Sequence, residues 1–124
     1  MLRDLFSWPG RNRRTIAWLL PDGAPRRALV LDARFLRPLR ALGHTVVTAG
    51  EKAELVCARL PDEPDAPLIE RIRDYAGSLS GGGTVIVRSA AGDRARVAAA
   101  FLHAGLRDVE QARIGRSFLT SGTL

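Results

Sequence analysis

The feature that most constrains this chain is an apolar run at residues 28–31, which leads into Asp32 and then directly into a helical pattern. A run with almost no polar residue is typical of a strand that is buried on both faces, as the central strands of parallel sheets are. Ligands of open α/β sheets bind at the carboxyl ends of such strands. The sequence therefore predicts an α/β fold in which Asp32 lies where a cofactor would be expected.

The rest of the chain alternates between helical and strand patterns. Apolar residues at helical spacing predict three helices, at residues 35–42, 68–79 and 93–105. Short apolar or β-branched runs predict further strands, at residues 44–49, 53–58 and 84–87, with closing strands around Val109 and at residues 117–124. This order predicts three layers around a mostly parallel sheet. One antiparallel strand is expected near the C-terminus, because the last two strands have no room for a helix between them.

Two short links add constraints on this fold. Only residues 50–52 separate strand 44–49 from strand 53–58, whereas a crossover between neighbouring parallel strands needs about a dozen residues. We therefore expect strand 53–58 to lie on the far side of the central strand. The glycine-rich residues 80–83 run from a helix into a strand, whereas phosphate-binding loops run from a strand into a helix. They are interpreted as a structural turn.

The positive charge is concentrated near the N-terminus. Residues 1–40 contain nine arginines and three aspartates, which accounts for the whole formal net charge of +6. A solvated basic face is the simplest interpretation, and a surface for an acidic partner protein is the next. Nucleic acid is less favoured, because no interleaved aromatic residues accompany the arginines. The two tryptophans here fit either core packing or a docking surface. The residues predicted to bind a partner are Trp8, Arg11, Arg13, Arg14 and Trp18.

The sequence also argues against several other kinds of protein. The only cysteine, Cys57, excludes an internal disulfide, and with His44 and His103 as the only histidines it argues against a structural zinc site. His44 has no acidic residue close by and is interpreted as a surface or capping histidine. No apolar run approaches the roughly 18 residues of a membrane span, and no signal-peptide core is evident. We expect a cytoplasmic protein.

The order of elements resembles that of class I S-adenosylmethionine-dependent methyltransferases over residues 28–124. Residues 79–87 (LSGGGTVIV) look like the family's Leu-Lys-Pro-Gly-Gly segment before its fifth strand, with departures at Ser80 and Gly81. Residues 104–106 (AGL) look like the Ala-Gly-Phe before the sixth strand, and residues 117–124 fit the antiparallel seventh. The resemblance implies a three-layer Rossmann-like fold in which the third-strand region is missing.

Residues 1–27 are then a basic N-terminal segment with short helices that precedes the methyltransferase-like domain. One of these helices is predicted at residues 15–20, where Ile16, Leu19 and Leu20 share a face and Pro21 ends the element. A strand is the alternative for these residues.

The resemblance also identifies the positions that would hold the cofactor. The family's loop has an acidic residue followed by glycines at every second position, because the backbone must approach S-adenosylmethionine closely. Asp32 matches the acidic position, but the glycine positions hold Arg34, Leu36 and Pro38. The acid that would bind the ribose hydroxyls falls near Thr48, and the nearest acidic residue, Glu51, comes three residues later.

Two functions follow from these positions. The first is a non-catalytic methyltransferase-like subunit, without catalytic residues or cofactor, that binds and supports another protein subunit or a second copy of itself. The alternative is an atypical methyltransferase that binds S-adenosylmethionine through Asp32 and Glu51, with a partner chain completing the site.

Overall fold

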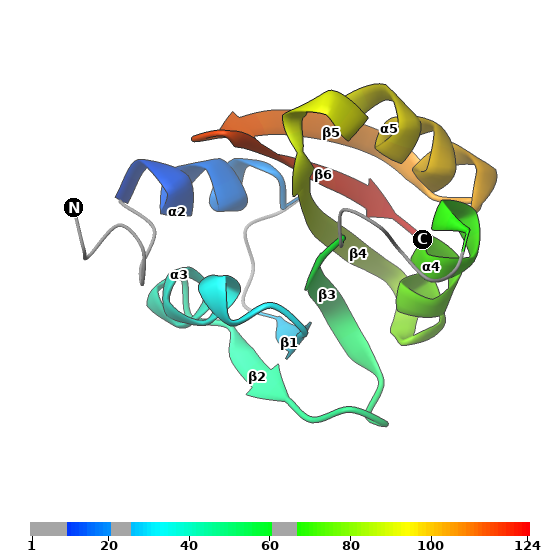
Figure 1. Ribbon diagram of the computed structural model, residues 1–124. Helices are drawn as coiled ribbons and strands as arrows, with labels where there is room; N and C mark the ends of the chain where they lie inside the picture. Colours follow the sequence, from blue (N-terminus) through cyan, green and yellow to red (C-terminus); the bar gives the residue numbers. More distant parts are fainter. Residues whose placement is uncertain (1–9, 21–25, 61–66) are drawn as a thin grey trace.

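The computed structural model describes residues 10–20, 26–60 and 67–124, which form a six-stranded sheet flanked by helices (Figure 1). The strand order is β2-β1-β3-β4-β6-β5. β1 to β4 are parallel to one another, and β6 is antiparallel to both of its neighbours. The mostly parallel sheet with antiparallel C-terminal pairing is therefore confirmed. The strands are β1 (Arg27–Val30), β2 (Thr45–Val47), β3 (Ala53–Arg59), β4 (Leu79–Ala90), β5 (Arg107–Ile114) and β6 (Ser117–Thr123).

Helices cover both faces of the sheet and make three layers. One face carries α2 (Gly10–Trp18), the 3-10 turn η1 (Ala33–Phe35) and α3 (Leu36–Ala41), and the other carries α4 (Leu68–Gly77) and α5 (Arg94–His103), which follows the short turn η2 (Ala91–Asp93). Alternate residues of β3 point to opposite faces: Leu55 and Cys57 pack with the α2 and α3 core, and Val56 and Ala58 with the α4 and α5 core.

The central position of β1 is confirmed, because it pairs with β2 on one side and with β3 on the other. Ala28 and Leu29 pack into the cores on opposite faces, as a strand buried on both sides requires. The strand ends earlier than predicted, at Val30, and the Leu31 side chain is 52% exposed. As expected from the short link at residues 50–52, β3 lies on the side of β1 opposite to β2.

The predicted turn at residues 80–83 is instead an irregularity within one long strand. β4 begins at Leu79, which pairs with Ala53, and the next paired residues are Thr84 and Leu55. The extra residues on β4 are accommodated by a bulge in which Gly82 has φ +79°. Glycines inside a strand favour such a bulge, and here they let β4 continue without leaving the sheet.

His44 is buried, with 5% of its surface exposed, so its interpretation as a surface residue is wrong. Its capping role is confirmed. The backbone N–H of Arg26 donates to Nδ1 of His44 over 2.9 Å, just before β1 begins. Burial, and then the charge of Arg26, lower the pKa of His44, because both disfavour the imidazolium form. β2 begins at the next residue and is shorter than predicted.

The predicted helix at residues 15–20 is confirmed as the second half of α2 and the residues that follow it. Ile16, Leu19 and Leu20 are at most 5% exposed and pack on the sheet beside Phe35 and Leu39. The strand alternative is wrong. Asp93 occupies the N-cap position of α5, but its carboxylate pairs with Arg96 instead of capping the helix.

Candidate functional site

At the carboxyl end of β1, both carboxylate oxygens of Asp32 have hydrogen-bond partners within the chain. One carboxylate oxygen, Oδ1, accepts a hydrogen bond from the backbone N–H of Arg34 and caps the turn η1. The other, Oδ2, accepts from Nε of Arg88 over 3.0 Å. The two side chains are only 9% and 11% exposed, so this is a nearly buried ion pair. The single acidic residue at the predicted cofactor position is therefore already neutralised by a charge within the chain.

Arg88 reaches Asp32 from the far side of β3. It lies two residues before the end of β4, level with Arg59, the last residue of β3. Since β3 lies between β1 and β4, the ion pair spans the carboxyl edge of one intervening strand. Cys57 is fully buried on that strand, and burial, followed by the charge of Asp32, raises the pKa of its thiol. A thiol that is buried and held protonated in this way is a poor nucleophile.

Side chains fill the loop where the methyltransferase family has glycines. The chain enters η1 directly after Asp32 and continues into α3 without an open loop. Phe35 is fully buried, and Pro38 is buried in the first turn of α3, where its missing N–H costs no helical hydrogen bond. Together with Arg34 and Leu36, these residues build a packed helical turn, which does not match a backbone cradle for S-adenosylmethionine.

Glu51 lies apart from Asp32. Its Oε1 accepts a hydrogen bond from Thr48 Oγ1 over 2.6 Å, and its Oε2 is 2.8 Å from Arg27 Nη2. These bonds, the one from Thr48 first, hold the pKa of Glu51 below its usual value. Arg27 is the first residue of β1, whereas Asp32 comes two residues after the strand ends. The two acids assigned to the cofactor in the alternative function are thus engaged at opposite ends of the same strand.

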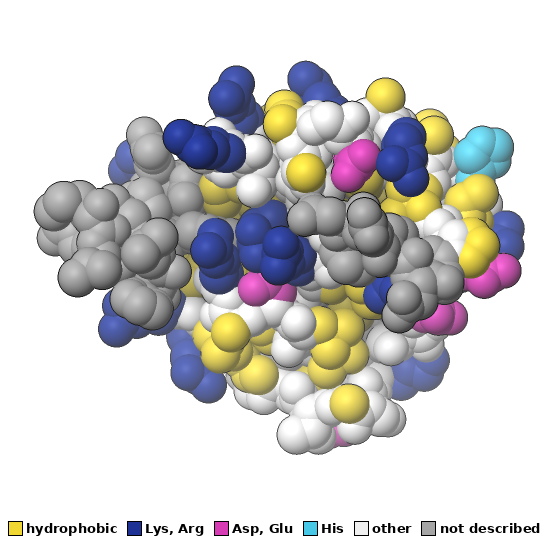
Figure 2. Space-filling model, in the orientation of Figure 1, with side chains coloured by type: hydrophobic (Ala, Val, Ile, Leu, Met, Phe, Trp, Pro, Cys, Tyr) yellow, Lys and Arg dark blue, Asp and Glu magenta, His cyan; other side chains and the backbone are white. Residues whose placement is uncertain are grey.

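The residues predicted for partner binding are only partly described. Trp18, at the end of α2, is 64% exposed, and Arg14 is also exposed on this helix. Arg11 and Arg13 belong to the same helix, but their side chains, like the whole of Trp8, lie outside the described residues. Figure 2 shows basic side chains scattered over one face of the molecule, with few acidic ones between them. The exposed side chains of Trp18 and Arg14 are the described part of the predicted docking surface.

Arg88 is the site residue that the sequence analysis missed. The available signal was a single charged side chain at the end of an otherwise apolar strand, residues 84–88. Within the described ranges, no cluster of three or more potential metal ligands occurs, and no helix is long and apolar enough to cross a bilayer.

Comparison with known proteins identifies the fold. No family model matches the sequence, and neither does any curated protein. Solved structures do match. A methyltransferase from Pyrococcus furiosus has a TM-score of 0.59 and 9% identity over 91% of this chain and 81% of its own. An O-methyltransferase family protein from Burkholderia thailandensis has a TM-score of 0.53 and 14% identity over 91% of this chain and 56% of its own.

A third similar structure, a putative methyltransferase from Pseudomonas syringae, is covered almost completely. Its TM-score is 0.56, with 16% identity over 94% of this chain and 99% of the other. At such identities the likeness establishes the fold alone. The chain has a class I methyltransferase-like, Rossmann-like fold, as its sequence predicted.

Proposed function

We propose that this chain is a non-catalytic methyltransferase-like subunit that binds and supports a partner protein and holds no S-adenosylmethionine. The observation that carries the proposal is the ion pair between Asp32 and Arg88 at the carboxyl edge of the sheet. It engages the acid that the family's pattern assigns to the cofactor. The packed turn from Asp32 to Pro38 supports the same conclusion, because it presents side chains where a close backbone approach is needed.

The energetic cost of admitting the cofactor supports this proposal. Removing one partner of a buried ion pair costs about 3 to 5 kcal/mol, because the other charge is left uncompensated. A loss of about 4 kcal/mol changes a micromolar dissociation constant into a millimolar one. A ligand that must displace Arg88 from Asp32 would therefore bind too weakly to serve as a resident cofactor.

Calorimetric titration of the purified chain with S-adenosylmethionine and S-adenosylhomocysteine tests the absence of a cofactor. We expect a dissociation constant no tighter than about 1 mM for either. A methyltransferase that binds the cofactor, measured in the same buffer, is the positive control. A dissociation constant near or below about 10 μM would overturn the proposal and favour the atypical methyltransferase.

The partner-binding part of the proposal rests on Trp18, because exposed tryptophans on a helix are frequent anchors of interfaces. Co-purification of the tagged chain from its native cells tests it, with Trp18→Ser as the variant and Leu102→Ser as a matched control, since Leu102 is an equally exposed apolar residue on α5. We expect a stoichiometric partner that Trp18→Ser loses and Leu102→Ser retains. Sedimentation measurements distinguish a second copy from another protein. A monomer without a stoichiometric partner contradicts this part.

A further inference from the structure

β5 forms one edge of the sheet, and within the described part of the chain its outer side is unpaired. It is the last strand in the order β2-β1-β3-β4-β6-β5, with β6 as its neighbour. Residues 110–114 pair regularly with β6, and the irregularity lies before them, between Arg107 and Glu110. An edge strand presents a row of backbone N–H and C=O groups to which another strand can bind. The regular part of β5 is therefore suited to accept a further strand.

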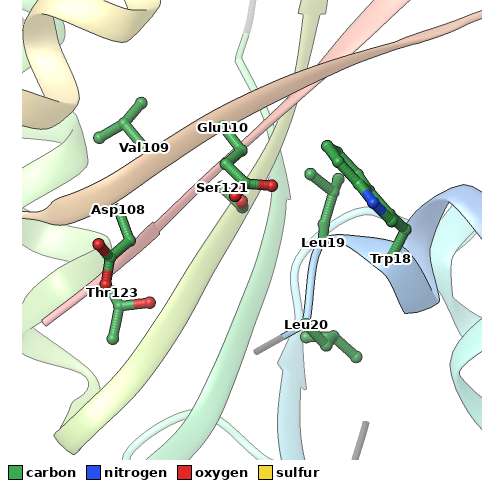
Figure 3. A pocket seen from close by; sticks show the side chains of 8 residues that line it. All are labelled: Trp18, Leu19, Leu20, Asp108, Val109, Glu110, Ser121 and Thr123. Carbon is green, nitrogen blue, oxygen red and sulfur yellow. The ribbon is translucent and has the colours of Figure 1, made fainter. Parts of the chain in front are cut away.

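The charges beside this edge change sign along β5. Asp108 and Glu110 line a hollow with Trp18, which lies at the end of α2 (Figure 3). A second hollow is lined by Arg14, Thr15, Trp18, Ala112 and Arg113. Beside α2, the edge is therefore acidic in the first half of β5 and basic in the second. Charged side chains usually keep an edge strand from pairing with other chains, unless the new chain brings matching charges.

A second copy of β5, placed antiparallel to the first, brings matching charges. Antiparallel copies of one strand are related by a twofold axis perpendicular to the sheet, so each acidic half meets a basic half. With this axis near Gln111, Glu110 lies opposite Ala112 of the second copy, and directly opposite residues share a face of the sheet. Ala112 packs against the core on the α2 face and lines the basic hollow with Arg14. Glu110 of each copy therefore approaches Arg14 of the other.

Trp18 provides the apolar part of this contact. The residue is 64% exposed, and because it lines both hollows it lies beside the middle of β5. Within the described part of the chain, neither Glu110 nor Arg14 forms a salt bridge. We propose that the chain forms a twofold-symmetric homodimer by antiparallel pairing of β5 with β5, and that reciprocal ion pairs between Glu110 and Arg14 set its register. This inference rests on the proposed partner-binding function and names the partner as a second copy.

Sedimentation equilibrium of the full-length chain over a range of concentrations tests this proposal. We expect a monomer–dimer equilibrium in the micromolar range, as befits a small interface. Glu110→Arg and Arg14→Glu should each weaken the dimer about tenfold or more, because each sets two pairs of like charges against one another. The matched controls are Glu70→Arg on α4 and Arg37→Glu on α3, which make the same changes of charge at exposed positions of other helices. Both controls should leave the dimer unchanged.

Mixing the two charge variants tests the register itself. In a dimer of one Glu110→Arg chain and one Arg14→Glu chain, the two substituted side chains meet each other with opposite charges. The second contact keeps the original pair of Glu110 and Arg14. An equimolar mixture should therefore dimerise within about threefold of the unsubstituted chain, although each variant alone is mostly monomeric. Restoration by mixing also shows that both variants are folded.

Amide hydrogen exchange adds a readout of the backbone. Strand pairing should slow the exchange of alternate N–H groups within residues 109–113 as the concentration rises. A monomer at concentrations up to about 200 μM, a dimer that neither charge variant weakens, or no restoration on mixing would each overturn the proposal. A monomer that co-purifies with another protein would overturn the second copy and leave the proposed function standing. Titration with S-adenosylmethionine tests the absence of a cofactor separately, whatever the oligomeric state.

Discussion

At the scale of single residues, the ion pair between Asp32 and Arg88 is the interaction whose loss we expect to destabilise the fold most. Arg88→Met removes the charge but keeps most of the volume, and it leaves Asp32 nearly buried without compensation. We expect a loss of about 3 kcal/mol or more in the free energy of unfolding, measured by urea denaturation.

The chain offers a control for this substitution. Arg96→Met breaks the more exposed pair with Asp93 and should cost less than about 1 kcal/mol. Combining Arg88→Met with Asp32→Asn should restore much of the stability, because no charge then remains unpaired. Equal losses for Arg88→Met and Arg96→Met would show that the pair at the sheet edge contributes no more than a surface one.

His44 should make the stability of the chain depend on pH. Its folded-state pKa is lowered from 6.5 by burial and by Arg26, so the folded state binds its proton less readily than the unfolded state does. The stabilisation is complete above the unfolded value and is lost as the pH falls through 6.5 towards the folded pKa. Protonation also removes the acceptor that Nδ1 offers to the Arg26 N–H.

We therefore expect the melting temperature to fall between about pH 7.5 and about pH 5, and to fall less in His44→Asn, which keeps an acceptor but cannot be protonated. His103→Asn is the matched control, since His103 is exposed at the end of α5. Parallel melting curves for His44→Asn and the unsubstituted chain would exclude His44 as the source of the pH dependence.

The residue scale is also where the sequence was least informative. The sequence placed Asp32 at the carboxyl end of β1, because it comes only two residues after that strand and its neighbours in sequence determine its position. Its partner Arg88 was not predicted, because it is 56 residues away in sequence. The two side chains come close only because β1, β3 and β4 are consecutive strands of the sheet.

At the scale of elements, the glycines in the β4 bulge differ in the space that each leaves for a side chain, although they lie close together in the sequence. A Cβ on Gly83 would lie 2.9 Å from the backbone oxygen of Ser80 and 3.0 Å from that of Glu54, closer than real Cβ contacts. A Cβ on Gly81 would meet nothing within 4 Å. We expect Gly83→Ala to destabilise the chain by about 1 to 3 kcal/mol and Gly81→Ala to be neutral, as measured by thermal or urea unfolding. Similar effects of both substitutions would mean that the bulge adapts to a side chain.

The types of the elements were predictable, and their ends were less so. Periodic apolar residues predicted α4 and α5, and short apolar runs predicted β1, β3 and β4. The start of β4 was misplaced because consecutive glycines usually mark a turn, whereas here pairing with β3 holds them in the sheet. Such pairing is a long-range interaction that local patterns do not contain.

At the scale of the whole molecule, the strand order followed from chain geometry. The short link before β3 excluded a parallel pairing of β3 with β2. Accordingly, β3 lies on the side of β1 opposite to β2. The resemblance to methyltransferases likewise predicted the antiparallel β6. The basic N-terminal segment was harder to interpret, because part of it, α2, contributes to the core of the fold.

Two truncations should separate these roles of the N-terminal segment. Removing residues 1–14 leaves Ile16, Leu19 and Leu20, so we expect a folded chain with a cooperative melt, whereas removing residues 1–20 also deletes these three buried residues. Each such loss costs about 2 to 5 kcal/mol, and together they approach the whole stability of a typical domain. Circular dichroism should therefore show an unfolded chain after the longer deletion only. A cooperative melt for the longer deletion would show that α2 is dispensable.

The interior position of β6 has a consequence for how the chain is made. Among the strands that the structure describes, β5 is hydrogen-bonded only to β6, which follows it in sequence and separates it from β4. During synthesis on the ribosome, the parallel strands β1 to β4 can therefore assemble while β4 still has an open edge and β5 has no place in the sheet. Open edges invite pairing with other chains. We therefore expect translation products that stall before Ser117 to be prone to aggregation. Chaperones should bind them more strongly than they bind the full-length chain.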